Sequence, residues 1–143
     1  MNGPQPAPTS SSAITTLVGK AQDSERAGRR ELARRYYESA LYLMSRDDDP
    51  ELASSILRRI ARTYIDDREF DVAFDCLEAA LAVSEAIGET VGIAHAINSM
   101  AGAHLYCGNL DEAESLYGRA RRVVALTQED RLKAMIAQNL GII

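Results

Sequence analysis

The sequence predicts an all-α fold in which antiparallel helical hairpins stack side by side. Aromatic residues make up only 6% of the 143 residues, and Ala and Leu recur every three or four positions, which favours helices over a β-sandwich or barrel. Small residues also return at a constant interval of 40, as in the set Ala21, Ala61, Ala101 and Gly141. A single hairpin cannot bury both of its faces, so each hairpin should depend on its neighbours.

The composition divides the chain into a short tail and a repeat region. Residues 1–12 hold three of the four prolines, three serines and almost nothing to bury, so we expect a disordered tail there. Within residues 13–143 the apolar positions follow a helical period, and breaks at Gly28, Asp67 and Gly108 separate two helices in each repeat. The predicted units are 13–49, 50–89, 90–127 and a partial unit, 128–143.

The ends of several helices carry local signals. Asp49 precedes Pro50 at the first helical position, where a missing N–H is tolerated, and Gly88 is suited to a helix C-terminus. Thr127 and Asp130 have the spacing of a capping box. The predicted helices span residues 13–27, 30–46, 50–66, 69–87, 90–107, 110–126 and 128–142.

The second and third units share a pattern of a large residue and an alanine in the first helix, then two alanines around a large residue in the second. The second unit has Leu57, Ala61, Tyr64, Ala73, Leu77 and Ala80, and the third has Ile97, Ala101, Ala113, Tyr117 and Ala120. This pattern resembles the tetratricopeptide repeat, in the subclass with the longer period of 40. The resemblance implies a right-handed superhelical stack, an α-solenoid of about three repeats plus a final helix. It also implies a concave groove, lined by the first helices, that binds peptides or helices.

Two departures from the family pattern affect the function that is expected. Lys20 and Ser24 replace apolar residues in the first unit, which is therefore expected to be an N-terminal cap. Val18 and Ser99 occupy places where family members that bind chaperone tails carry Lys and Arg, so chaperone-tail binding is not expected.

The C-terminal residues leave two alternatives open. The last helix is either a solvating cap or the first helix of a further repeat in a longer protein, and the apolar Ile142 and Ile143 favour the longer protein. Self-association is also possible in principle, because an apolar stripe without a following helix is expected to attract a second copy. The stripe comprises Leu132, Met135, Ile136, Leu140 and Ile143.

Charge and composition exclude several classes of partner. The net charge of −5 opposes broad attraction to nucleic acid or anionic lipid. No segment approaches the ~20 apolar residues that a membrane span needs. The two cysteines, Cys76 and Cys107, are too few for a disulfide framework and are expected to be reduced thiols. The predicted location is therefore the cytoplasm.

No constellation of catalytic or metal-ligating residues is evident, and neither an enzyme nor a cofactor is expected. His95 and His104 are nine residues apart and point to opposite faces of one helix, so they cannot share a metal. His104 and Cys107 share a face but are too few for a zinc site, and His104 is expected to pack in the place of the family's Tyr. The run 47–49 lacks the spacing of a calcium loop.

The candidate functional site lies on the predicted first helices. Arg58, Arg59 and Arg62 form a basic cluster that could grip carboxylates of a partner; the alternative is a solvated face paired with nearby acids. The neighbouring first helices should add Gln22, His95, Asn98, Gln138 and Asn139. A second basic group lies around the first turn and is expected to form mostly surface pairs with Glu25, Glu31 and Glu38. It comprises Arg26, Arg29, Arg30, Arg34 and Arg35.

The main prediction is a scaffold that binds a protein or peptide in its concave groove, and the arginines there favour a partner with acidic residues. The alternatives are an N-terminal sensor domain of a larger bacterial signalling protein, which would control an attached output domain, and a self-association module. Neither nucleic acid nor a membrane is expected as a partner.

Overall fold

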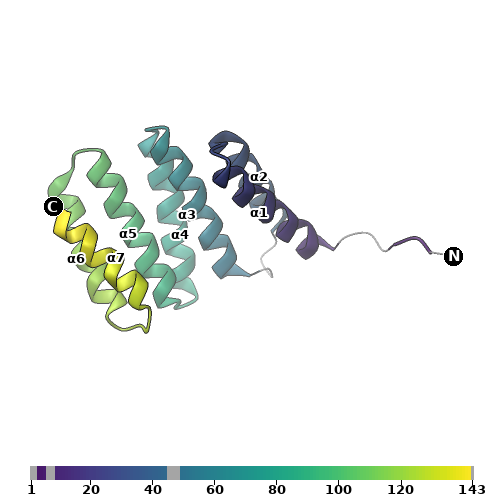
Figure 1. Cartoon of the computed structure of the whole chain (residues 1–143). Helices are drawn as coiled ribbons and strands as arrows, with labels where there is room; N and C mark the ends of the chain where they lie inside the picture. Colours follow the sequence, from purple (N-terminus) through teal and green to yellow (C-terminus); the bar gives the residue numbers. More distant parts are fainter. Residues whose placement is uncertain (1–2, 6–8, 45–48, 143) are drawn as a thin grey trace. The chain divides into compact units, whose positions relative to one another are not determined.

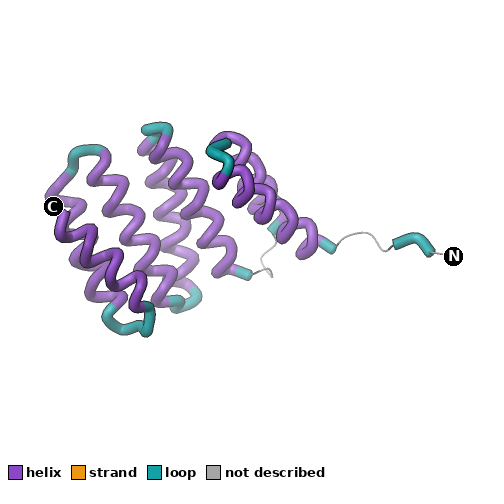
Figure 2. Tube along the Cα trace, in the orientation of Figure 1, coloured by secondary structure: helices purple, strands orange, loops and turns teal. Residues whose placement is uncertain are grey.

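The computed structural model describes residues 3–5, 9–44 and 49–142, and it contains helices but no strands within these ranges (Figures 1 and 2). The chain forms two compact units, Met1–Asp48 and Asp49–Ile143, and each is described by itself below. The helices are α1 (Ser10–Arg26), α2 (Arg30–Leu43), α3 (Pro50–Asp66), α4 (Phe70–Ala86), α5 (Thr90–Tyr106), α6 (Leu110–Val124) and α7 (Asp130–Ile142).

The first unit is a helical hairpin of α1 and α2. Its core contains alanines at the helix crossing, flanked by larger side chains, which lets the two axes approach closely. The buried residues are Ile14, Ala21 and Ser24 of α1 and Ala33, Tyr37 and Ala40 of α2. Helix α1 begins at Ser10, inside the predicted tail, because the Thr9 hydroxyl accepts a hydrogen bond from the Ser12 amide and caps the helix.

The second unit contains α3 to α7 in two rows. Each helix packs on the next along the chain, and α3 also contacts α5 directly. A hydrogen bond between Asn139 and Asn98 joins α7 to α5, so the first helices of successive hairpins, α3, α5 and α7, are neighbours. An ion pair between Arg119 and Glu85 joins α6 to α4 in the other row. Figure 1 shows these antiparallel helices from teal to yellow.

The core of the second unit follows the 40-residue repeat. Its alanines at the helix crossings are completely buried: Ala61, Ala73, Ala80, Ala101, Ala113 and Ala120. Larger residues fill the space beside them, with Leu77 buried in the second hairpin and Ile97 and Tyr117 in the third. The repeat in the sequence therefore corresponds to a repeat in the packing.

Most of the predicted helix ends agree with the structure. The Asp49 carboxylate accepts hydrogen bonds from the amides of Glu51 and Leu52, as expected for a cap, and Gly88 has a φ of +66° just after α4. The prediction for the start of α7 is wrong. The Thr127 hydroxyl donates to the carbonyl oxygen of Val124 and accepts from the Glu129 amide, so it closes the preceding turn, and α7 begins at Asp130.

The expected apolar stripe on α7 is largely used within the unit. Leu132 and Ile136 are buried in a cluster with residues of α5 and α6, and Leu140 packs against the same cluster. Met135 remains 39% exposed, and Ile143 lies outside the described residues. Self-association through this helix stays a prediction, with less apolar surface available than the sequence suggested.

Candidate functional site

The predicted site residues of the second unit lie on the row of first helices, which we call the first-helix face. It comprises Arg58, Arg59 and Arg62 on α3, His95 and Asn98 on α5, and Gln138 and Asn139 on α7. The eighth predicted residue, Gln22, lies half-buried on α1 in the first unit. The structure therefore brings seven of the eight candidates onto three neighbouring helices of one compact unit.

Arg58 is the most constrained of the three arginines. Its side chain is half-buried, whereas Arg59 and Arg62 are exposed. The Arg58 Nε atom is buried and has no hydrogen-bond partner among the described residues. Burial lowers the pKa of Arg58, the nearby charge of Arg59 lowers it further, and the charge of Glu89 acts in the opposite direction. Arg58 is thus a partly desolvated cation with an unused donor.

His95 lies on α5, which packs against α3, and the charge of Arg58 acts on it. Burial, and then the positive charge of Arg58, lower the pKa of His95 to about 4. The imidazole is therefore neutral at pH 7 and offers one N–H donor and one acceptor. Arg58 and His95 are close enough for their charges to interact, so the two helices place a cation and a titratable ring together.

Two side-chain amides extend the first-helix face toward α7. The Asn139 Nδ2 donates a hydrogen bond to the Asn98 Oδ1 at 3.1 Å, and both side chains are half-buried. Asn98 lies about one helical turn beyond His95 on α5, so it belongs to the same side of the helix. Each amide keeps further donors and acceptors that could serve a peptide backbone. Gln138, next to Asn139, is exposed.

Glu89, which was not among the predicted site residues, acts on Arg58 through its charge. It is the N-cap of α5, and its Oε2 accepts a hydrogen bond of 2.6 Å from the Gly92 amide. Its charge also reaches Arg58. The signal that could have revealed its capping role is the repeat itself, because Glu89 lies 40 residues after the capping residue Asp49.

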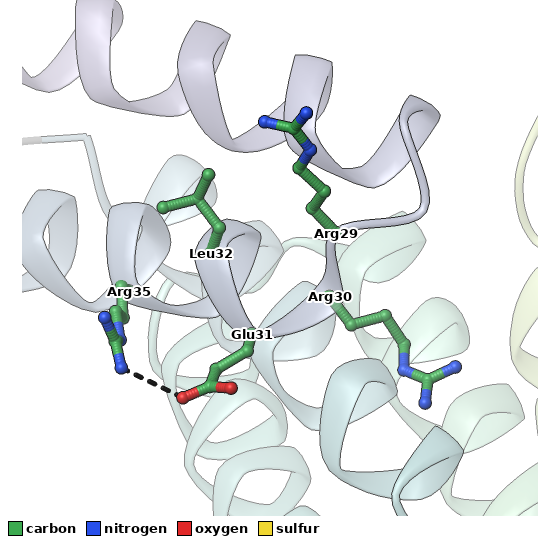
Figure 3. Close-up of a pocket in the computed structure, with 5 residues that line it drawn as sticks. All are labelled: Arg29, Arg30, Glu31, Leu32 and Arg35. Carbon is green, nitrogen blue, oxygen red and sulfur yellow. Dashed lines mark hydrogen bonds and ion pairs between the residues drawn. The ribbon is translucent and has the colours of Figure 1, made fainter.

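Two open cavities lie away from the first-helix face. One, of about 370 Å³, is lined by Arg29, Arg30, Glu31, Leu32 and Arg35 of the first unit. Figure 3 shows Arg35 reaching Glu31, with 2.9 Å between the Arg35 Nη2 and the Glu31 Oε1. The other, of about 700 Å³, is lined by His104 and residues 108–112 at the turn between α5 and α6.

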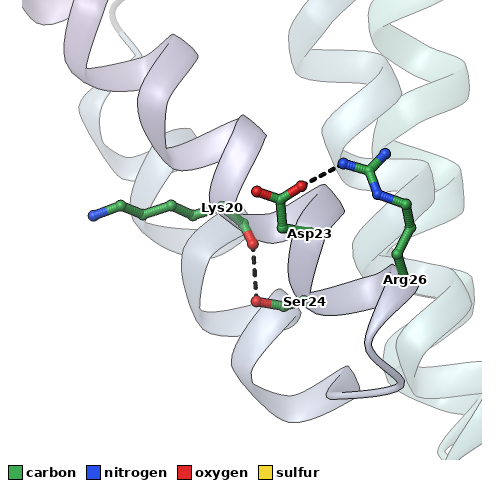
Figure 4. A network of polar contacts seen from close by, with 4 residues as sticks. All are labelled: Lys20, Asp23, Ser24 and Arg26. Atoms are coloured by element: carbon green, nitrogen blue, oxygen red, sulfur yellow. Dashed lines mark hydrogen bonds and ion pairs between the residues drawn. The ribbon is translucent and has the colours of Figure 1, made fainter.

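The basic group around the first turn forms local pairs. Arg26 pairs with Asp23 three residues earlier, as Figure 4 shows, and the Ser24 hydroxyl in the same view donates to the Lys20 carbonyl oxygen. The Arg26 and Asp23 side chains are both more than 70% exposed, so their ion pair adds little stability. These contacts support the expected surface pairing.

Comparison with known families identifies the repeat. Two models of the tetratricopeptide repeat family match the chain, one over residues 12–88 and the other over residues 93–124. The chain belongs to the tetratricopeptide repeat family. A search of curated proteins finds no match. No helix in the described part of this tetratricopeptide repeat chain is long and apolar enough to cross a membrane.

Solved structures with the same fold are distant in sequence. The tetratricopeptide repeat domain of Arabidopsis FLU is 18% identical with a TM-score of 0.75, covering 83% of this chain and all of that one. The Yersinia enterocolitica type III secretion translocator chaperone SycD is 19% identical with a TM-score of 0.75 and coverages of 94% and 92%. The first tetratricopeptide repeat domain of Spaghetti (RPAP3), bound to an HSP90 peptide, is 20% identical with a TM-score of 0.62 and coverages of 90% and 94%.

His104 occupies the tyrosine position of the tetratricopeptide pattern and packs as expected. Its ring lies 4.5 Å from that of Phe74, measured between centroids, and its Nδ1 is 3.4 Å from the Asn109 Nδ2. Cys107, which was expected to share a helix face with His104, is exposed. Among residues 3–5, 9–44 and 49–142, no group of three or more His, Cys, Asp or Glu side chains is placed to hold a metal ion.

Proposed function

We propose that this chain is a protein-interaction module that binds a peptide or an extended segment of a partner protein across the first-helix face. Membership of the tetratricopeptide repeat family supports interaction with proteins rather than catalysis. The observation that carries the specific site is Arg58, a half-buried cation whose Nε lacks a partner among the described residues. Buried polar groups are nearly always hydrogen-bonded, so we take this half-buried guanidinium as the centre of the proposed site.

The chemistry of the face favours a partner with acidic residues. Arg58, Arg59 and Arg62 lie within five residues of one helix, and Arg guanidinium groups bind carboxylates through paired hydrogen bonds. The Asn98 and Asn139 amides on the adjoining helices suit the backbone of the same segment. Each charge-assisted hydrogen bond contributes about 1.5–3 kcal/mol before association costs, so a few of them support roughly micromolar binding.

The test compares two charge-reversed variants. Partners captured with the wild-type chain are purified, and their affinities are measured by calorimetry for the wild type, for Arg58→Glu with Arg62→Glu, and for Arg121→Glu with Arg122→Glu. Arg121 and Arg122 are exposed on α6, in the other row of helices, so this pair is a control with the same change in charge. The proposal expects loss of binding only in the first variant.

An equal loss in both variants would show a general charge effect, and full retention by the α3 variant would exclude the first-helix face. Circular dichroism must show that each variant keeps its helical content. Arg62 is exposed, and the change at half-buried Arg58 is the one that needs this check.

A further inference from the structure

The turn between α1 and α2 carries a concentrated positive charge in a chain that is acidic as a whole. Residues 26–35 contain five arginines and a single acid, Glu31, whereas the net charge of the chain is −5. All five cations are Arg rather than Lys. The planar guanidinium group of Arg donates two parallel hydrogen bonds to an oxyanion, which the compact ammonium group of Lys does not do. The composition of this turn therefore favours a ligand with several anionic oxygens.

The open cavity of about 370 Å³ at this turn lies among these side chains, and we call it the turn cavity. Its lining brings together Arg29, Arg30, Arg35, Glu31 and the half-buried Leu32 (Figure 3). Because Glu31 is paired with Arg35 at 2.9 Å, the lining keeps a surplus of two formal positive charges. A phosphomonoester carries a charge of about −1.5 to −2 at pH 7, which matches this surplus.

The charged side chains of the turn cavity are accessible to a ligand. The Arg35 and Glu31 side chains are 69% and 76% exposed, and an ion pair with such exposure is weak enough to be exchanged for another anion. Arg29 is the N-cap of α2 and makes no side-chain hydrogen bond to the helix. Figure 3 shows Arg29 and Arg30 extending away from each other. Both side chains are exposed, so they can turn toward a common anion at some cost in rotamer freedom.

We propose that the turn cavity binds a phosphomonoester carried on a phosphorylated segment of a partner protein. Arg29 and Arg30 supply the guanidinium hydrogen bonds, and Leu32 offers an apolar contact to the side chain that carries the phosphate. The lining residues belong to the first turn of α2, where the helix dipole also favours an anion. This is a second site, in the first unit, with a ligand chemistry different from that proposed for the first-helix face.

The shape and charge of the turn cavity favour a phosphorylated protein segment over other sources of phosphate. Small-molecule sites usually enclose most of the ligand surface, whereas this cavity is open and leaves room for a chain on either side of a phosphoryl group. Nucleic acid and anionic lipid present many phosphates over a wide area, and the excess of acids in this chain repels such extended polyanions. A single phosphoryl group meets only the local positive charge.

The probe is a short, acetylated and amidated, alanine-rich peptide with one central phosphoserine. It is compared with the same peptide carrying serine or glutamate at that position, and with inorganic phosphate. Calorimetry measures the affinities for the full chain, and NMR of the isotope-labelled chain shows which backbone amides shift. The phosphopeptide should bind at least about tenfold more tightly than the serine and glutamate peptides, and more tightly than inorganic phosphate. The largest amide shifts should fall within residues 29–35.

Two double variants with the same change in charge locate the site. Arg29→Gln with Arg30→Gln should weaken binding of the phosphopeptide at least about tenfold. Arg121→Gln with Arg122→Gln removes another pair of adjacent, exposed arginines, from α6, and should keep the affinity of the wild type. All four side chains are exposed, so both variants should fold, and circular dichroism checks their helical content.

A single variant tests whether the ion pair in the lining competes with the ligand. Glu31→Gln releases Arg35 and removes the negative charge of the turn cavity, so it should bind the phosphopeptide about two- to fivefold more tightly. Weaker binding by this variant would show that Arg35 and Glu31 do not face the ligand.

Each remaining outcome decides one part of the proposal. Phosphopeptide binding that survives the joint change of Arg29 and Arg30, or amide shifts confined to the first-helix face, overturns the assignment to the turn cavity. Equal affinity for the serine and phosphoserine peptides overturns phosphate recognition. Inorganic phosphate that binds as tightly as the phosphopeptide overturns a protein segment as the source. Tighter binding, per phosphate, of single-stranded RNA or of vesicles containing phosphatidylserine overturns the choice of a single phosphoryl group.

Discussion

Replacing Gly92 with Ala should destabilise the second unit, although alanine is ordinarily the better helix former. Gly92 is buried in the first turn of α5, at the third helical position after the cap. A Cβ atom built on it would overlap the Oε2 of Glu89 and lie 2.6 Å from the Oγ of Ser84. Ser84 cannot easily move, because it is buried and its Oγ lies 2.8 Å from that of Ser54.

The expected size of the effect comes from opposing contributions. Displacing Glu89 leaves the buried amide of residue 92 without its acceptor, which costs about 1–3 kcal/mol including the loss of the cap. Crowding Ser84 adds about 1 kcal/mol or more of packing strain. The higher helix propensity of Ala than of Gly offsets about 1 kcal/mol of this destabilisation. The net destabilisation should be about 2 kcal/mol, a fall in Tm of roughly 10 °C for a domain of this size.

Thermal and urea unfolding, followed by helical circular dichroism, measure this difference. Gly118→Ala is the matched control, because a Cβ at this position of α6 meets its nearest neighbour, the Arg122 side chain, at an ordinary 3.7 Å. The control should be stabilised by up to about 1 kcal/mol. Gly92→Ala should also be less damaging in a Glu89→Ala background, where the overlapping carboxylate is gone. A Gly92→Ala protein at least as stable as wild type would refute the reasoning.

Three further results are expected. The pKa of His95 is about 4 in the folded chain and about 6.5 in the unfolded chain, so the unfolded state binds more protons between these pH values. The free energy of unfolding should therefore fall by at most about 3 kcal/mol as the pH drops from 6.5 to 4. A fall of equal size in His95→Gln would contradict this. Gly108 has a φ of +82°, so Gly108→Ala should lower the unfolding free energy by about 1–2 kcal/mol, whereas exposed Gly141 in α7 should accept Ala without loss. Glu89→Gln keeps an oxygen for the Gly92 amide but removes a negative charge that acts on Arg58, so it should bind the captured acidic partner more tightly in calorimetry at pH 7.5; weaker binding would contradict this.

The helices and their crossings could be predicted because local and long-range signals agree. Ala61 and Ala101 recur at 40 residues, and both are completely buried where hairpins cross. The turns were less regular than the repeat suggested. Arg68 has a φ of +60° at the position where the other two hairpins carry Gly28 and Gly108, so the backbone there keeps its turn without glycine. Its guanidinium lies 5.8 Å from the ring centroid of Phe70, a contact between neighbours that no periodicity indicates.

The helices that carry the candidate residues were predictable, but the electrostatics of those residues were not. The resemblance to the tetratricopeptide repeat implied that Arg58, His95 and Asn98 lie on first helices, and the structure has them on α3 and α5. The half-burial of Arg58 and the low pKa of His95 depend on how α3 packs against α5, and these residues are 37 positions apart in the sequence. The sequence also could not show that Asn139 reaches Asn98, because that bond depends on the crossing of α7 and α5.

Glu89 explains why the site keeps an unused donor in a chain with an excess of acids. As the cap of α5 it must point one oxygen at the Gly92 amide, and the missing Cβ of Gly92 makes room for that geometry. A carboxylate committed to the backbone attracts Arg58 at a distance but leaves the Nε without a partner among the described residues. The cap therefore stabilises the helix through the same carboxylate whose charge acts on Arg58, which couples the start of α5 to the electrostatics of the first-helix face.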